Sequence, residues 1–132
     1  MNESFDSKSQ GCPFCDFPIH RIIAQNELAF VIRDEYPVTP LHTLVIPKRH
    51  VSGLFDLGTP EMNACNDLLL RAKDAIGKED ASVAGFNVGV NIGAAAGQTI
   101  FHCHIHLIPR RHGDVEHPRG GVRHIIPGKG NY

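Results

Sequence analysis

The sequence predicts an α+β domain, with an antiparallel sheet of about five strands, one long helix and one short helix. Three observations predict this class. Four segments have apolar patterns of strand length, one segment has helical apolar spacing, and the 132-residue chain has the size of one compact domain. The polar, aperiodic start predicts a flexible tail over residues 1–11, and the folded core is expected to begin near residue 12.

The first two predicted strands lie in the N-terminal half. "ELAFVIRDE", residues 27–35, alternates well enough to predict a strand. "HTLVIPKRH", residues 42–50, is an apolar strand that we expect to end at Pro47. The two prolines of the preceding "PVTPLH" favour an extended or turning loop.

A long helix is predicted to begin near Thr59. Thr59 is a suitable N-cap and Pro60 suits the first helical position. Apolar residues then recur at helical spacing up to Gly77: Met62, Cys65, Leu69, Ala72 and Ile76. Such a helix would cover one face of the sheet, and the short helix is expected around "SGLFDL" just before it.

Two further strands are predicted to form an antiparallel pair. "GFNVGVNIG", residues 85–93, and "HCHIHLIPR", residues 102–110, each alternate polar and apolar side chains. Because alternate residues of a strand share a face, His102, His104 and His106 are expected on one face, with Asn91 beside them. The small residues of the connecting loop would let backbone N–H groups approach an anion such as a phosphate.

Composition excludes several classes of protein. The net charge of −1 argues against a general nucleic-acid binder. The chain shows neither an apolar run of about 20 residues, as a membrane span needs, nor the apolar stretch of a signal peptide. We therefore expect a cytoplasmic protein with no nucleic-acid or membrane partner. Its four cysteines suit reduced thiols or a metal site better than a disulfide framework.

These motifs together resemble the histidine-triad (HIT) nucleotide hydrolases and transferases. The resemblance extends from "HCHIHLIPR" to "AAAGQT", "VNIG" and "PVTPLHTLVIPKRH", so it implies a HIT domain over residues 12–111 and a C-terminal extension over 112–132. The "PR" after the triad is more similar to the dinucleoside-polyphosphate hydrolase branch than to the phosphoramidase branch.

The resemblance implies an activity. Such an enzyme cleaves dinucleoside polyphosphates or nucleoside phosphoramidates at the α-phosphate through a covalent nucleotidyl-histidine, and releases a nucleoside monophosphate. It implies that His104 is the nucleophile, that His106 lies near the leaving group, and that His102 supports the nucleophile. His42 matches a fourth histidine that fixes tautomer and orientation. No catalytic cofactor is expected, and a homodimer is implied.

The resemblance also implies substrate contacts. Thr99 matches a hydroxyl residue beside the scissile bridge, Gln98 and Asn91 match phosphate and ribose contacts, and Asp34 matches a residue on the ribose hydroxyls. Apolar side chains near the N-terminus would hold the base, which we expect to be a purine: Phe17, Ile19 and Ile32.

"CPFC", residues 12–15, supplies two thiolates of a possible zinc site. Some bacterial members of the family complete such a site with two histidines, so the resemblance implies structural zinc on Cys12, Cys15, His50 and His102. Free reduced thiols are the alternative.

Two other functions remain open from the sequence. Three alternating histidines can also form a catalytic metal site, which would make the protein a metal-dependent enzyme. The same fold could instead serve a non-catalytic nucleotide-binding regulatory protein. The basic residues from Arg110 onward are expected either to reach distal phosphates or to be solvated.

Overall fold

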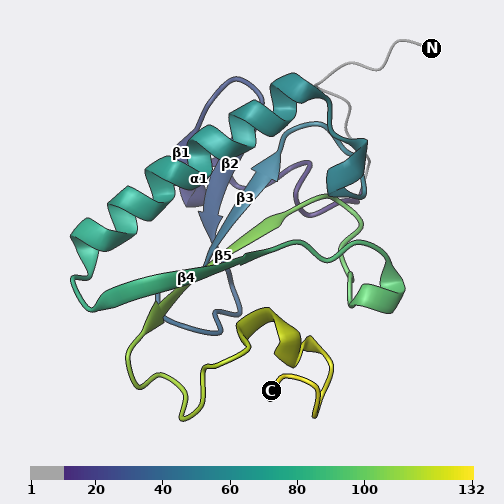
Figure 1. Ribbon diagram of the computed structural model, residues 1–132. Helices are drawn as coiled ribbons and strands as arrows, with labels where there is room; N and C mark the ends of the chain where they lie inside the picture. The colour runs from purple at the N-terminus through teal and green to yellow at the C-terminus, as the bar shows by residue number, and fades with distance from the viewer. Residues whose placement is uncertain (1–10) are drawn as a thin grey trace.

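The computed structural model describes residues 11–132, so the predicted tail lies outside the described residues except for Gly11. The described chain forms an open five-stranded antiparallel sheet with one long helix across it (Figure 1), which confirms the predicted fold class. Along the sheet the strand order is β1-β2-β3-β5-β4. The strands are β1 (Ala24–Gln25), β2 (Ala29–Arg33), β3 (Thr43–Pro47), β4 (Val83–Gly89) and β5 (Ile105–Arg111).

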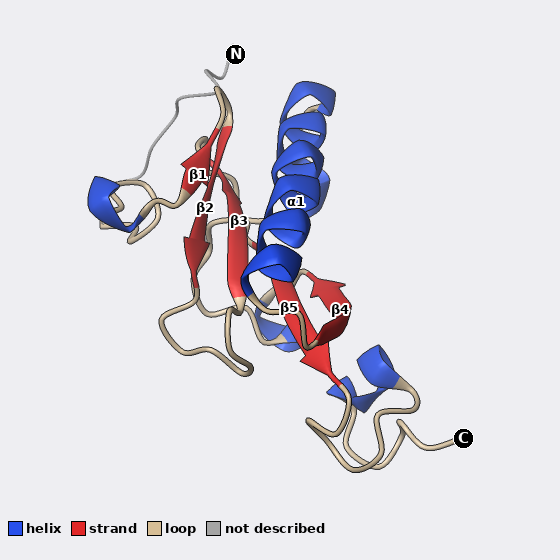
Figure 2. Cartoon of the chain, turned by 90° about the vertical axis from the view of Figure 1, so that its left-hand side faces the viewer, coloured by secondary structure: helices blue, strands red, loops and turns tan. Residues whose placement is uncertain are grey.

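Helix α1 (Thr59–Glu79) packs on one face of the sheet, and the segment with the 3₁₀ turn η1 (Ile19–Arg21) lies on the side away from it (Figure 2). Strands β2 and β3 are therefore covered on both faces. Val31 and Val45 belong to the apolar cluster beneath α1, whereas Phe30 and Ile46 belong to a second cluster on the other face. Burial on both faces explains why these strands read as nearly continuous apolar runs.

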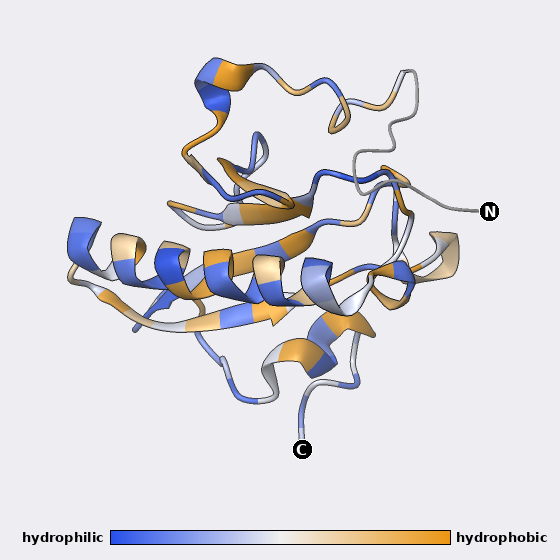
Figure 3. Cartoon of the chain, turned by 90° about the horizontal axis from the view of Figure 1, so that it is seen from above, coloured by the Kyte–Doolittle hydropathy of each residue, from blue (hydrophilic) through white to orange (hydrophobic). Residues whose placement is uncertain are grey.

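The strands beneath α1 consist largely of hydrophobic residues, whereas α1 itself alternates hydrophobic and hydrophilic residues (Figure 3). The helix differs from the sequence prediction at its start, because its N-cap is Gly58 and not Thr59. The Glu61 side chain accepts the Gly58 N–H at 2.9 Å, which is the half of a capping box that a glycine N-cap allows.

The buried face of α1 is also rotated from the predicted one. It consists of Glu61, Cys65, Leu68, Ala72 and Ile76, while Met62 is 41% exposed and Leu69 only half-buried. The physical reason is that Arg49 pairs with Glu61 and allows a carboxylate to be buried, which apolar spacing alone does not reveal.

Strand β5 begins at Ile105, so only His106 of the three histidines lies in the strand, and the prediction that they share one strand face is wrong for His102 and His104. Ahead of the strand the chain bonds elsewhere: the Cys103 N–H donates to the carbonyl of Val51 at 2.7 Å. The predicted antiparallel pairing of β4 with β5 is confirmed, with Gly89 opposite His106.

Three further boundaries differ from or refine the prediction. Strand β4 covers Val83–Gly89 and so ends earlier than the predicted 85–93. The predicted short helix is the 3₁₀ turn η2 (Leu54–Asp56), and the C-terminal extension contains a further 3₁₀ turn, η4 (Gly121–Ile125). Among the described residues, no helix combines the length and the apolarity that crossing a membrane requires.

Candidate active site

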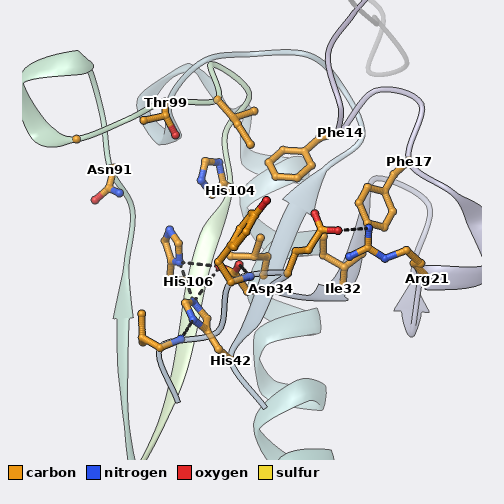
Figure 4. A pocket seen from close by; sticks show the side chains of 16 residues that line it. Phe14, Phe17, Arg21, Ile32, Asp34, His42, Asn91, Thr99, His104 and His106 are labelled. Carbon is orange, nitrogen blue, oxygen red and sulfur yellow. Dashed lines mark hydrogen bonds and ion pairs between the residues drawn. The ribbon is translucent and has the colours of Figure 1, made fainter. Parts of the chain in front are cut away.

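A pocket of about 310 Å³ opens where the N-terminal segment, the β2–β3 connection and the β4–β5 connection meet (Figure 4). Most of the site residues expected from the sequence line it: Ile32, Asp34, His42, Asn91, Thr99, His104 and His106. The walls combine apolar side chains with convergent polar groups, as small-molecule sites usually do. His102 and Gln98 do not line this pocket.

His104 lies in the pocket between Thr99 and His106 (Figure 4). Its Nδ1 is 2.8 Å from the carbonyl oxygen of His102. Because a carbonyl can only accept a hydrogen bond, Nδ1 carries the proton and Nε2 keeps a lone pair in the neutral ring. The geometry therefore leaves His104 Nε2 as the ring nitrogen with a free lone pair.

His42 and His106 form a hydrogen-bonded pair whose proton positions follow from the backbone. The Val38 N–H donates to His42 Nδ1 at 3.1 Å, so the proton of neutral His42 is on Nε2. That Nε2 lies 2.9 Å from His106 Nδ1 and donates to it, which leaves the proton of neutral His106 on Nε2. Burial lowers the pKa of both rings, and that of His106 to about 4, so both are neutral at pH 7.

Asp34 lies at the edge of this histidine pair. Its Oδ1 accepts the Tyr36 N–H at 2.8 Å, and its Oδ2 lies 3.4 Å from His42 Nε2 and 3.9 Å from His106 Nδ1. Three ligand atoms this close could in principle hold a cation. However, a metal on His42 Nε2 would require that nitrogen to lose its proton, while the Val38 N–H occupies the other nitrogen. A hydrogen bond explains the close approach of His42 and His106 without a metal.

A second cluster lies behind the pocket and joins Cys12, Cys15, His50 and His102, the four residues that the resemblance implies. His102 Nδ1 is 3.2 Å from His50 Nδ1, 3.4 Å from Cys12 Sγ and 3.6 Å from Cys15 Sγ. Ligands about 2.0–2.1 Å (N) and 2.3 Å (S) from a tetrahedral zinc ion would be separated by about 3.3 Å (N to N) and about 3.6 Å (N to S). The donor atoms therefore have the spacing that such an ion needs.

The orientation of His102 supports the same conclusion. The ring is fully buried, and its Nε2 lies 2.7 Å from the carbonyl oxygen of Pro47, to which it donates. The lone pair of the neutral ring is therefore on Nδ1, which faces the two thiols and His50. A metal-ligating histidine usually donates its other N–H to a carbonyl or carboxylate in this way.

Gln98 is placed differently from the expected phosphate contact. Its side-chain amide is buried and donates to the carbonyls of Ser52 at 2.7 Å and Ile100 at 3.1 Å, while its Oε1 accepts the Gly93 N–H at 2.8 Å. The side chain holds the loop between β4 and β5 closed. Gly93 and Gly97 in this loop have φ near +90°, a backbone conformation that residues other than glycine rarely adopt.

The N-terminal segment supplies pocket residues that the sequence interpretation missed. Phe14, from within the Cys-x2-Cys turn, and Arg21 line the pocket with Phe17. The Arg21 guanidinium lies 4.7 Å from the centre of the Phe17 ring. Ile19, expected to hold the base, is 77% exposed and does not line the pocket. The sequence feature that could have identified Phe14 is its position, as an apolar residue between the two cysteines of the Cys-x2-Cys turn.

The arginines from Arg110 onward, at the end of β5 and in the C-terminal extension, contact other residues of this chain. Arg110 forms a bidentate pair with Asp114 at 2.8 and 2.9 Å, and Arg111 pairs with Asp80 at 2.9 Å. Arg119 and Arg123 each lie over the ring of Tyr132, at 4.6 and 4.8 Å. None of these arginines lines the pocket.

Comparison with protein families identifies one match: the model of the HIT domain matches residues 19–113. Among curated relatives, an uncharacterized HIT-like protein of Synechococcus elongatus is 36% identical over 90 residues, which cover 68% of this chain and 78% of that protein. A protein of Mycobacterium tuberculosis named AP-4-A phosphorylase is 32% identical over 118 residues, which cover 83% of this chain and 58% of that protein.

Solved structures show the same similarity. A Zn-bound histidine triad family protein from Mycobacterium smegmatis is 38% identical with a TM-score of 0.70, over 79% of this chain and 78% of that chain. A HIT family protein from Bacillus anthracis is 34% identical with a TM-score of 0.72, over 79% of this chain and 76% of that chain.

Proposed function

Because the chain belongs to the HIT domain family of nucleotide-binding hydrolases and transferases, we propose that it cleaves dinucleoside polyphosphates or nucleoside phosphoramidates at the α-phosphate. The product is a nucleoside monophosphate, and the intermediate is a nucleotide bound to His104. One observation carries the proposal: the hydrogen bond from His104 Nδ1 to the His102 carbonyl leaves Nε2 free as a nucleophile in the pocket.

The proposed reaction has two displacements. With a dinucleoside polyphosphate, His104 Nε2 bonds to the α-phosphorus while the bond from that phosphorus to the bridging oxygen breaks, and a nucleoside polyphosphate departs as an anion. Nδ1 keeps its proton, so the ring becomes a cation that the His102 carbonyl stabilises. Water then cleaves the phosphorus–nitrogen bond, releases a proton to solvent and returns His104 to its neutral form. The N–H on His106 Nε2 stabilises negative charge near the leaving group.

The remaining pocket residues suit a nucleotide. We propose that Thr99 hydrogen-bonds the scissile bridge, that Asn91 contacts the phosphate or ribose, and that Asp34 accepts the ribose hydroxyls. Gln98 contributes on the phosphate side by holding the loop that carries Gly97, which lines the pocket. Ile32 and Phe17 form an apolar wall suited to a purine.

Structural zinc on Cys12, Cys15, His50 and His102 is part of the proposal. The spacing of the four donor atoms and the name of the Zn-bound relative support it. The metal would supply a cross-link and no open coordination position, because all four ligands come from the protein.

We also propose a homodimer in the cytoplasm. Strand β4 lies at the edge of the sheet, where Val88 is 51% exposed and a second copy could cover it. The cysteines of the described residues form no disulfide, which suits a reducing compartment.

The metal-dependent alternative is less well supported by the geometry. A three-histidine catalytic site needs the triad rings to converge on one ion. His102 Nδ1 instead faces Cys12 and Cys15, while His104 and His106 line the pocket. A non-catalytic regulatory protein is distinguished by experiment, because it would bind nucleotide without turnover.

The test is to trap the intermediate. Protein mixed with diadenosine tetraphosphate and quenched in base should carry a nucleotide on His104, because phosphorus–nitrogen bonds to histidine survive alkali. His104→Ala should lower kcat by roughly 10⁴- to 10⁶-fold, as expected for loss of a covalent nucleophile. His20→Ala is the control, because this exposed histidine of η1 does not line the pocket. Inversion of configuration at phosphorus would contradict the proposal.

A further inference from the structure

Two contacts connect the Cys12–Cys15–His50–His102 cluster with His104. The first runs along the backbone, because the carbonyl oxygen that accepts the His104 Nδ1–H belongs to His102, itself a member of the cluster. The second runs through Phe14, which lies between the two cysteines in sequence and is 7% exposed.

The ring of Phe14 touches histidines on both sides. Its centre is 5.9 Å from that of His102 at an interplanar angle of 90°, and 5.2 Å from that of His104 at 66°. Both are edge-to-face contacts within the range in which aromatic rings attract one another. The His104 ring is therefore restrained at one nitrogen by a hydrogen bond and along one side by Phe14.

Phe14 has little freedom to move while the thiols of Cys12 and Cys15 stay in contact with His102 and His50. Cys12 precedes Phe14 by two residues, and its Sγ lies 3.4 Å from His102 Nδ1. Cys15 follows Phe14 directly, and its Sγ lies 3.3 Å from His50 Nδ1. Behind Phe14, the apolar cluster with Phe30, Ile32, Leu44 and Ile46 closes the other side. When the Cys-x2-Cys turn is fixed, the position of Phe14 against His104 is fixed with it.

The geometry points to Phe14 as a positioning residue through which the metal cluster sets the orientation of the nucleophile. The metal would then act on catalysis without touching the substrate: its withdrawal frees the Cys-x2-Cys turn, releases Phe14 and lets the His104 ring rotate away from the line of attack. The inference rests on the proposed function for its kinetic consequence, but the ring contact itself is independent of any substrate.

The test uses Phe14→Leu, which keeps an apolar side chain and removes the ring. The variant should keep the metal content of the wild type. The rate of nucleotidyl-His104 formation at saturating diadenosine tetraphosphate should fall roughly 10- to 100-fold, because small displacements of a reacting group have effects of this size. NMR signals of the His104 ring in the substrate-free protein should lose the ring-current shift that Phe14 causes.

Phe30→Leu is the matched control. Phe30 is 4% exposed in the same apolar cluster, and it does not line the pocket. Because leucine keeps an apolar side chain behind Phe14, this variant should lose stability but keep the rate and the His104 signals. A second arm titrates the wild-type holoprotein with a chelator and should show metal release and movement of the His104 signals at the same chelator concentration.

The outcomes separate the two proposals. If wild-type protein forms no adduct, the proposed function fails, while the NMR arms still decide the coupling. If Phe14→Leu forms the adduct at the wild-type rate and His104 signals do not respond to chelator, the positioning role of Phe14 is wrong.

Discussion

Two histidines of the triad donate to backbone carbonyls through opposite nitrogens, and this difference separates their roles. His102 donates through Nε2 and keeps a lone pair on Nδ1, the atom proposed as a zinc ligand, whereas His104 donates through Nδ1 and keeps a lone pair on Nε2, the atom proposed as the nucleophile. The alternating sequence pattern correctly indicated an unusual concentration of imidazoles. It could not reveal which nitrogen of each ring is free, because the carbonyl partner of His102, Pro47, lies 55 residues away.

The third histidine, His106, gives a prediction about pH. Burial, together with the neighbouring His104 and His42, lowers its pKa from 6.5 to about 4, while Asp34 opposes the shift. Protonation of His106 is less favourable in the folded state than in the unfolded state. Above pH 6.5 both states are neutral at this ring, whereas the free energy of unfolding falls progressively as the pH drops from 6.5 to about 4.

NMR titration of the ring C–H signals should show that His106 stays neutral down to about pH 5. A His106 midpoint at or above its ordinary value would mean that the ring is solvated or charged, contrary to the arrangement with His42.

At the scale of elements, apolar patterns located the strands and the long helix but not their limits. Pro47 ends β3 as expected, since proline cannot donate to a strand ladder. The start of β5 and the rotation of α1 were missed because both depend on partners distant in sequence: Val51 bonds Cys103 ahead of β5, and Arg49 pairs with Glu61 on α1.

The Arg49–Glu61 pair joins the end of β3 to the first turn of α1. Arg49 donates to both carboxylate oxygens at 3.0 and 2.8 Å, and Glu61 is fully buried. We predict that Glu61→Gln lowers the free energy of unfolding by about 3–5 kcal/mol, because the buried pair then loses the negative charge that accepts two hydrogen bonds from the Arg49 guanidinium.

Denaturation by urea measures this loss, and Asp67→Asn is its control. Asp67 and Arg71 form an ion pair on the same helix at 2.9 Å, but their side chains are 50% and 61% exposed. Exposed pairs contribute at most about 1 kcal/mol, so the control should change little. Equal effects of the two substitutions would show that the Arg49–Glu61 pair contributes no more than a surface contact.

At the scale of the whole molecule, three distant segments meet at the Cys12–Cys15–His50–His102 cluster. The N-terminal turn, the chain after β3 and the chain before β5 contribute to it, with separations of 35 to 90 residues. The Cys-x2-Cys spacing supplied only half of this ligand set, and the other half came from resemblance to known relatives. No local pattern connects His50 with the two cysteines, because only the folded sheet brings them together.

The last prediction concerns what this cluster does for stability. Purified protein should contain close to one zinc per chain, and the double variant Cys12→Ser with Cys15→Ser should lose the zinc and several kcal/mol of unfolding free energy, because metal bound only by the native state stabilises that state. Cys65→Ala is the control: burial raises the pKa of Cys65 to about 12, so it remains a protonated thiol in the core beneath α1. Chelator should lower the Tm of the wild type and of the Cys65→Ala variant but leave that of the double variant unchanged. A wild-type protein that is purified without zinc, and whose Tm neither rises with added Zn²⁺ nor falls with chelator, would show that the four residues hold no metal ion and that other contacts fix the N-terminal turn.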